Sequence, residues 1–342
     1  MRSSRAKSII STAEPLITIG ITCYNEGDEL LECWESVLSQ TDNRWVAVLI
    51  MDGTRHERTR QIFEGLSHPK LRKFSMRTNV GPYPARNKAV ALTETPYHLY
   101  LDGDDCLPPY AVGTILDSFQ KNPDADYVFG DMEYFGRIAT KIKLKPFTTD
   151  EVATRQCIPG ACSYKKSLWE ALGGYAAELA RGNADYDFCI GIVEAGFKGV
   201  YVPQVLYRVR ERERNISDSY LLTYHETHEI MVARHPKFFA DRRRDQFLAL
   251  GYQRSARANY AAGNLRAAAE LDRKAQRHGM FWNVGLWQLR LEAKIPCRVW
   301  SVVWGVLRGA RRLWQMLRMI LTAFTSWWSS SQLVAKGDWH GR

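Results

Sequence analysis

The stretch YHLYLDGDD, residues 97–105, decides the fold class, because an apolar run ends abruptly in three carboxylates. Residues 97–101 carry the aromatic and aliphatic side chains typical of a buried strand. Asp102, Asp104 and Asp105 follow at once, and Gly103 between them allows the backbone to approach a neighbouring segment closely. A polar turn at the carboxyl end of a strand is where α/β proteins build ligand sites.

The segments around this stretch alternate between strand and helix patterns from residue 16 to about residue 135. Strands are predicted at residues 16–23, 45–51, 71–74, 97–101 and 127–129, with helices between them at 30–38, 84–92 and 109–119. A further strand is predicted at residues 199–206. This alternation predicts an α/β fold with a mostly parallel, Rossmann-like sheet flanked by helices. Residues 22–26, 52–54 and 102–105 each follow a strand, so we expect them to meet in one site.

The three carboxylates of residues 102–105 are candidate metal ligands. Oxygen ligands of this kind suit Mg²⁺ or Mn²⁺, and a diphosphate substrate can complete the coordination of such an ion. A metal here would offset the charge of a sugar diphosphate and stabilise the departing nucleoside diphosphate. A solvated acidic turn is the competing interpretation, but CLPP at 106–109 starts a helix and holds the turn between two elements.

A second acidic motif, NADYD at residues 183–187, offers a general base for an acceptor hydroxyl. On a helix that begins here, Asp185 shares a face with Phe188 and Ile192, and Asp187 falls on the opposite side. We therefore expect Asp185 to point inward and Asp187 outward. The alternative is that Asp185 only interacts with the dipole at the start of the helix.

The ordered set of motifs resembles glycosyltransferase family 2, the GT-A-fold family of nucleotide-sugar enzymes. The matching stretches lie between residues 16 and about 210, in the family's order and spacing. They are IGITCYNE (19–26), SQT (39–41), MDGT (51–54), NVG (79–81), ARN (85–87), LDGDD (101–105), GGY (173–175) and DYD (185–187).

The resemblance implies a role for each matching residue. The nucleobase, usually uracil, would be held by Thr22, Tyr24 and Asp52, because an aromatic face and a well-placed acceptor suit a planar pyrimidine. The nucleotide-binding set as a whole is Thr22, Tyr24, Glu26, Asp52, Arg86 and Asp102, with a solvated helix charge as the alternative for Arg86. Asp104 would be the principal metal ligand, with Asp102 and Asp105 contacting the metal or the ribose. Asp185 would be the general base.

Three positions depart from the family's usual pattern. Met51 replaces the first acid of the usual Asp-Asp-Gly-Ser, and Ala184 stands where a glutamate is common. Arg210 stands near the place of a histidine that can help bind the metal. Arg208 or Arg210 could instead contact the diphosphate, since guanidinium groups pair with phosphate oxygens. A surface charge run with residues 211–214 is the alternative for both arginines.

The chain is expected to divide into four parts. These are a flexible tail at residues 1–15, a GT-A domain at 16–232, a helical hairpin region at 233–295 and a tail at 296–342. The net charge of +10 comes from the part that begins at residue 234, because the part before it carries slightly more acidic than basic residues. A hairpin is predicted over 247–278, where two helical stretches flank AGN at 262–264.

The tail at 296–342 combines arginines with tryptophans. On a helix over residues 299–324 the apolar side chains gather on one side and the arginines on the other. A basic amphipathic helix with tryptophans is typical of a segment that lies in a membrane surface. Packing on the catalytic domain or on a dimer partner is the alternative. We do not expect nucleic acid to bind, because the wide apolar face needs burial.

Two further patterns have simpler interpretations. The seven cysteines are scattered without a C-x-x-C pair, so we expect reduced, mostly buried thiols and a cytoplasmic protein. HETH at residues 225–228 lacks the spacing of a zinc-binding H-E-x-x-H motif, and a polar helix surface is expected. No window of about 18 residues is apolar and free of charge, so we expect no ordinary transmembrane helix.

These expectations combine into one functional hypothesis. The chain would be a metal-dependent, inverting glycosyltransferase that moves a sugar from a nucleotide-sugar donor, usually a UDP-sugar, to a hydroxyl of a glycan or lipid-linked acceptor. It would work in polysaccharide or cell-envelope glycan synthesis, peripherally attached to the inner face of the cell membrane. The alternative is a catalytically silent nucleotide-sugar-binding or scaffold protein that uses its helical tail for partners, and Met51, Ala184 and Arg210 favour it.

Overall fold

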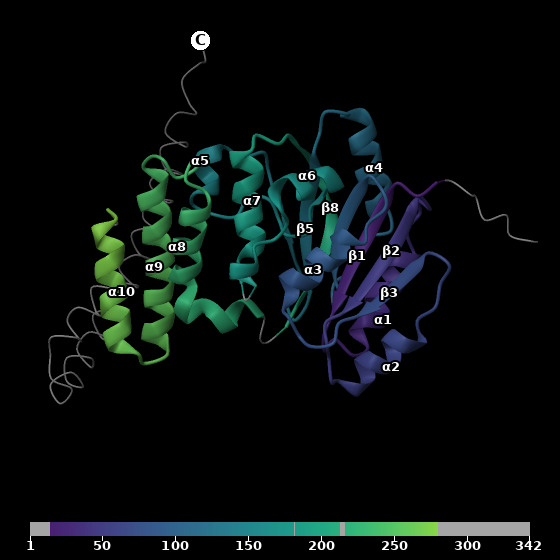
Figure 1. Ribbon diagram of the computed structural model, residues 1–342, viewed down its shortest axis with the longest axis horizontal. Helices are drawn as coiled ribbons and strands as arrows, with labels where there is room; N and C mark the ends of the chain where they lie inside the picture. Colours follow the sequence, from purple (N-terminus) through teal and green to yellow (C-terminus); the bar gives the residue numbers. More distant parts are fainter. Residues whose placement is uncertain (1–13, 181, 213–215, 280–342) are drawn as a thin grey trace, which may run out of the picture.

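The computed structural model describes residues 14–180, 182–212 and 216–279. One eight-stranded sheet with helices on both faces is followed by a group of C-terminal helices (Figure 1). The first elements are β1 (Ile17–Cys23), α1 (Glu29–Leu38), β2 (Trp45–Met51), α2 (Glu57–Gly65), β3 (Leu71–Ser75), α3 (Pro82–Ala91), β4 (Tyr97–Asp102), α4 (Ala111–Lys121), β5 (Tyr127–Gly136) and β6 (Thr140–Ile142). They continue with α5 (Thr149–Val152), β7 (Ser163–Lys165), α6 (Lys166–Leu172), η1 (Ala177–Leu179), α7 (Ala184–Glu194), β8 (Gly199–Glu211), η2 (Ile216–Thr223), α8 (Tyr224–Arg234), α9 (Arg243–Ala261) and α10 (Leu265–Arg277).

The sheet is mostly parallel, which confirms the predicted α/β class. Its order is β3-β2-β1-β4-β7-β5-β6, and β8 pairs with β5. The strands β3, β2, β1 and β4 run parallel to one another. β7 is antiparallel to both β4 and β5, and β5 is parallel to β8. Because β1 lies between β2 and β4, the segments that follow these three strands leave the sheet at the same edge.

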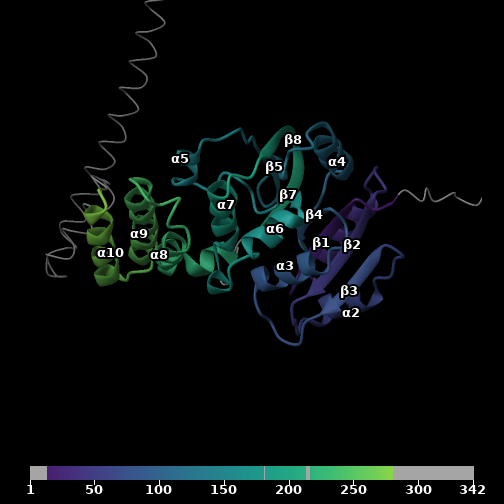
Figure 2. The same cartoon turned by 45° about the horizontal axis from the view of Figure 1, so that its top comes forward.

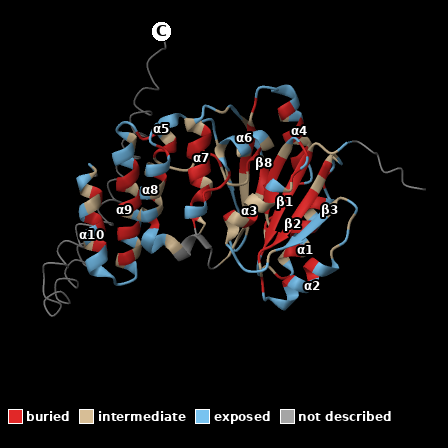
Figure 3. Cartoon of the chain, in the orientation of Figure 1, coloured by how far each residue is buried: buried red, intermediate tan, exposed pale blue. Residues whose placement is uncertain are grey.

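Side chains alternate between the two faces of the strands, and each face has its own helices. Odd-numbered residues of β1 and β2, such as Ile19 and Leu49, share a core with α1, α2 and α4. Even-numbered residues of β2, Val48 and Ile50, pack against Ala89 and its neighbours in α3. The centre of the sheet is therefore covered on both sides, and Figure 3 shows β1 and β2 buried over most of their length and β3 at the edge exposed.

The C-terminal helices form the end of the described chain that lies away from β3. Figure 2 shows α8, α9 and α10 side by side, as Figure 1 does. Apolar side chains of α9 and α10, including Leu248, Ala256 and Leu271, make a small core of their own. Phe247 of α9 instead joins the core of α7, so the predicted helical extension is present and packs on the α/β domain.

Two strands are longer in the structure than the sequence pattern predicts. β5 continues beyond residue 129 to Gly136, and β8 continues beyond residue 206 to Glu211. The two extensions pair with each other after a register shift near Asp131. Their polar side chains hid them from a pattern search, because this part of the sheet is only half buried.

The prediction of a polar helix surface for residues 225–228 is wrong in one respect. These residues do lie in a helix, α8, but the side chain of His228 is only 2% exposed. Its ring stacks on Phe247 of α9 with 4.1 Å between the ring centroids. The helix is therefore not a free polar surface, because α9 covers this side of it.

The predicted direction of Asp187 is also wrong. This carboxylate is 2% exposed and contacts Arg234 and His235, each at 3.0 Å. Burial opposes protonation of His235, but hydrogen bonds and charges from Asp187 and Glu194 outweigh it and raise the pKa of His235. The helical wheel assumed a single buried face on α7, whereas the end of α8 and the residues after it cover the second face.

Several expectations concern residues outside the described part of the chain. The N-terminal tail up to residue 13 and the tail from residue 280 onward belong to this group, as does Cys297. The six described cysteines are free and buried, as expected. None of the described helices is long and apolar enough to cross a membrane. The division into a domain at 16–232 and a helical region at 233–295 stays a prediction.

Replacing Asp187 by alanine tests the buried ion network. The variant should lose about 2–3 kcal/mol in free energy of unfolding, because it leaves Arg234 and His235 without their buried partner; the partial exposure of Arg234 lowers the figure. Urea unfolding measures the loss. Asp150→Ala, which breaks an exposed pair with Arg242, is the control and should cost about 0.5 kcal/mol or less. Equal losses in the two variants would contradict this account.

Candidate functional site

The carboxyl ends of β1, β2 and β4 meet, as the sequence predicted. Thr22 is in register with Ile50 of β2 and with Asp102 of β4. The backbone N–H of Asp52 donates to the carbonyl of Cys23, and that of Gly103 donates to the carbonyl of Thr22, both at 2.8 Å. A Cβ at residue 103 would stand 2.9 Å from the Thr22 carbonyl oxygen, which explains the glycine.

A cleft of about 890 Å³ opens at this edge of the sheet. Thr22, Tyr24, Glu26, Asp52 and Asp102 line it from the strand ends. The opposite wall comes from η1, from η2 and from the start of α8. All predicted nucleotide-binding residues except Arg86 therefore share one cleft. Tyr24 is 41% exposed, so its ring is open to a ligand.

Asp52 shapes one wall of the cleft. Its carboxylate accepts hydrogen bonds from the backbone N–H groups of Val80 at 2.9 Å and Gly81 at 3.0 Å. Burial raises the pKa of Asp52, and these two hydrogen bonds oppose the rise. The carboxylate thus fixes the NVG loop after β3, and its remaining lone pairs are available to a ligand.

Arg86 is not the solvated helix charge that was the alternative. Its guanidinium lies over the ring of Tyr100, 3.8 Å from the centroid, and near that of Tyr83. It makes an ion pair with Asp102 at 3.1 Å, and its Nε is buried without a hydrogen-bond partner among the described residues. Arg86 thus supports the cleft from beneath Asp102 and does not line it.

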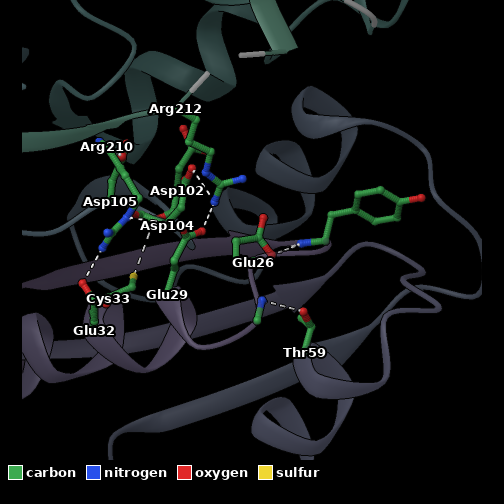
Figure 4. Close-up of polar contacts among 12 residues, drawn as sticks. Glu26, Glu29, Glu32, Cys33, Thr59, Asp102, Asp104, Asp105, Arg210 and Arg212 are labelled. Atoms are coloured by element: carbon green, nitrogen blue, oxygen red, sulfur yellow. Dashed lines mark hydrogen bonds and ion pairs between the residues drawn. The ribbon is translucent and has the colours of Figure 1, made fainter. Parts of the chain in front are cut away.

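The other two aspartates of the DGDD turn are paired within the protein (Figure 4). Asp104 makes an ion pair with Arg212 at 3.0 Å, and Arg212 also contacts Glu29 of α1. Asp105 accepts a hydrogen bond from the backbone N–H of Arg210 at 2.7 Å and is buried. Burial raises the pKa of both carboxyl groups.

Tyr207 connects the two ends of the acidic turn. Its hydroxyl accepts a hydrogen bond from the backbone N–H of Asp102 at 2.9 Å and donates to the carboxylate of Asp105. The end of β8 is therefore part of the site, although it follows β4 by about a hundred residues in the sequence.

Neither arginine proposed for the diphosphate lines the cleft, and Asp104 and Arg212 do not line it either. Arg208 pairs with Glu133 at 2.8 Å and lies over the ring of Phe135. Arg210 contacts Glu32 of α1 and donates to the backbone carbonyl of Asp104 at 2.8 Å. Arg210 thus holds the acidic turn against α1, whereas Arg208 comes earlier in β8 and its backbone pairs with that of Cys106.

Glu26 brings a further carboxyl group to the cleft. It accepts a hydrogen bond from the backbone N–H of Tyr24 at 2.6 Å (Figure 4). Burial raises the pKa of Glu26 to about 7, and the charges of Asp104 and Asp102 add to the rise. Carboxylates outnumber guanidinium groups in this cluster, so this edge of the cleft favours a cation.

The carboxylates of Asp102 and Asp104 are suitable ligands for a divalent ion. No group of three or more His, Cys, Asp or Glu side chains converges as a ready ligand set in the described residues. Mg²⁺ and Mn²⁺ do not need one, because water and substrate phosphates supply most of their ligands. Asp102 and Asp104 are partly exposed, whereas Asp105 is buried by its own hydrogen bonds and is not available.

Asp185 lies at the start of α7, close to Arg86. Its two carboxylate oxygens accept hydrogen bonds from the Tyr83 hydroxyl at 2.8 Å and from Gln156 at 3.0 Å. A Cβ at Gly160 would stand 3.2 Å from Asp185 and 3.7 Å from Arg86. The residues that line the main cleft do not include Asp185, which lines a small adjoining cavity of about 10 Å³.

Four residues of this arrangement were not predicted, namely Tyr83, Gln156, Tyr207 and Arg212. A sequence signal existed only for Arg212, because residues 208, 210 and 212 alternate and one face of a strand carries every second residue. The strand had been predicted to end at residue 206. Tyr83 and Gln156 reach Asp185 from distant parts of the chain, and no local pattern indicates that contact.

Comparison with known proteins agrees with this architecture. Residues 18–173 match the family model described as Glycosyl transferase family 2. An uncharacterized glycosyltransferase of Methanocaldococcus jannaschii is 24% identical over 217 residues, which are 60% of this chain and 74% of that protein. Chondroitin synthase of Escherichia coli is 27% identical over 187 residues, which are 53% of this chain and only 27% of that protein.

A solved structure shares the fold. The crystal structure of residues 1–349 of S. aureus TarS in complex with UDP-GlcNAc aligns with a TM-score of 0.60 at 15% identity, covering 76% of this chain and 81% of that one. The fold is therefore GT-A, the architecture that the sequence predicted. The family match covers residues 18–173, so this part of the chain belongs to Glycosyl transferase family 2.

Because the pKa of Glu26 is raised, the free energy of unfolding should depend on pH. A carboxyl group whose pKa rises from its ordinary 4.5 in the unfolded chain to about 7 in the folded protein destabilises the fold as pH rises between these values. Glu26→Gln should therefore match the wild type at about pH 5 and exceed its free energy of unfolding by about 1–2 kcal/mol at about pH 8, allowing for partial exposure. Urea unfolding at both pH values measures this. Glu35→Gln, on the exposed side of α1, is the control, and a Glu26→Gln variant that follows it at both pH values would contradict the prediction.

Proposed function

We propose that this glycosyltransferase is an inverting enzyme that moves a sugar from a UDP-sugar to a hydroxyl group of a glycan or a lipid-linked acceptor. The observation that carries the proposal is the convergence of Thr22, Tyr24, Asp52 and Asp102 in one cleft at the carboxyl ends of β1, β2 and β4. The open ring of Tyr24 can stack on a pyrimidine, and Asp52 can accept from its N–H.

Asp185 is proposed as the general base. The hydrogen bonds from Tyr83 and Gln156 hold its carboxylate in one orientation, and the carboxylate takes the proton from the acceptor hydroxyl. The acceptor oxygen then forms a bond to the anomeric carbon as the bond from that carbon to the diphosphate oxygen breaks. Attack from the face opposite the leaving group inverts the configuration.

Asp104 and Asp102 are the residues proposed to hold Mg²⁺ or Mn²⁺. Such an ion, when bound, supplies positive charge that stabilises the departing diphosphate. The partial exposure of both carboxylates and the excess of carboxylates around them support this assignment. Asp105 orients the turn through Tyr207 and the backbone of Arg210 and is no longer proposed as a ligand.

Synthesis of a polysaccharide or another cell-envelope glycan is the proposed setting, because a chondroitin synthase is among the relatives. We also propose peripheral attachment to the inner face of the cell membrane through residues 296–342, from their sequence pattern alone. The pattern predicts that the full chain floats with anionic liposomes and that a chain ending before Pro296 does not. Equal flotation of the two, or none of the full chain, would remove this part of the proposal.

The ion pair between Asp104 and Arg212 favours a second candidate, a silent nucleotide-sugar-binding or scaffold protein. Such a protein would keep the fold and the nucleotide cleft but would not transfer sugar. Measuring free UDP released from a panel of UDP-sugars separates the two candidates. Donor binding without release for any sugar, with glycan and lipid-linked acceptors present, would favour the silent protein.

Replacing Asp185 by asparagine tests the proposed base. Asparagine keeps the shape and removes the basicity, so turnover should fall by about a hundredfold or more while UDP affinity stays near that of the wild type. Release of UDP and isothermal titration measure the two quantities. Asp117→Asn, an exposed change on α4, is the control and should leave both unchanged. Wild-type turnover in Asp185→Asn would show that another group takes the proton.

A further inference from the structure

Arg212 occupies a position that nothing in the family resemblance assigns. It follows directly after β8, and its guanidinium lies between Asp104 of the acidic turn and Glu29 at the start of α1 (Figure 4). The Arg212 Nη2 atom is 3.0 Å from the Asp104 carboxylate. The Nε atom is buried without a hydrogen-bond partner among the described residues, so the guanidinium has donor capacity to spare.

The proposed metal ligand is thus already paired with a cation of the protein, which it shares with Glu29. A divalent ion on Asp104 would lie beside this guanidinium, and like charges at short distance repel. The two cations therefore compete for one carboxylate as long as no anion lies between them. A diphosphate removes the conflict, because its oxygens pair with a guanidinium and coordinate a metal at the same time.

From this geometry we infer that Arg212 competes with the metal for Asp104 in the empty enzyme and binds the diphosphate once the donor arrives. The inference rests on the proposed function. It makes Arg212 a donor-binding residue and couples metal binding to nucleotide binding: each makes the other more favourable, by the same factor. The empty site should then bind metal weakly, and the metal should enter together with the nucleotide.

The neighbouring arginines on β8 do not share this role. Arg208 pairs with Glu133, away from the turn, and Arg210 contacts Glu32 and the backbone carbonyl of Asp104 but not its carboxylate. Arg208→Gln is therefore a matched control, because it removes the same charge from the same strand and leaves Asp104 untouched.

The test measures Mn²⁺ binding to the full chain by electron paramagnetic resonance, with and without UDP. In Arg212→Gln, Mn²⁺ alone should bind about tenfold more tightly than in the wild type, because its competitor is gone. UDP should then strengthen Mn²⁺ binding less than it does in the wild type. Arg212→Lys keeps the charge and should stay near the wild type without UDP. Arg208→Gln should match the wild type in both conditions, and thermal unfolding checks that each variant is folded.

Two outcomes overturn the inference and differ in what else they overturn. If the wild type binds Mn²⁺ and UDP together but Arg212→Gln behaves as Arg208→Gln does, then Arg212 neither competes nor binds the diphosphate, and the proposed function stands. If the wild type binds no UDP at all, the proposed function fails and this inference fails with it.

Discussion

The concentration of carboxylate charge at the ends of three parallel strands is the constraint on which the rest of the structure depends. Parallel pairing of β1 with β2 and β4 brings Asp52 and the DGDD turn to one edge of the sheet. Such a cluster is costly to bury, and each aspartate has its own compensation. Arg86 pairs with Asp102, Arg212 pairs with Asp104, and Tyr207 with the Arg210 backbone satisfies Asp105.

These compensations explain why distant segments are part of the site. β8 follows β4 by about a hundred residues, yet it supplies Tyr207, Arg210 and Arg212 to the acidic turn. Its long extension is paired with β5 and does not depend on burial of apolar side chains. The basic residues at its end therefore compensate the negative charge of the acidic turn. In the sequence alone they resemble an ordinary surface charge run.

The sequence predicted the parts of the fold that local patterns control. Continuous apolar strands such as β1 and β2, and turns such as LDGDD, are visible in a short window, so the mostly parallel sheet and the grouping of Thr22, Tyr24 and Asp52 could be anticipated. The direction of Asp187 could not, because Arg234 and His235 lie in an element with no strong pattern of its own. The role of Arg212 was hidden for the same reason, since a guanidinium finds its carboxylate only in the folded chain.

Binding of UDP to the cleft is the central claim, and isothermal titration of UDP into the full chain tests it most directly. The account predicts one site per chain in the presence of Mn²⁺, and an affinity at least about tenfold weaker in Asp52→Asn, which replaces one acceptor oxygen of the carboxylate by an N–H donor. Asp117→Asn on α4 should bind UDP as the wild type does. No binding to the wild type, or equal affinity in Asp52→Asn, would contradict the account.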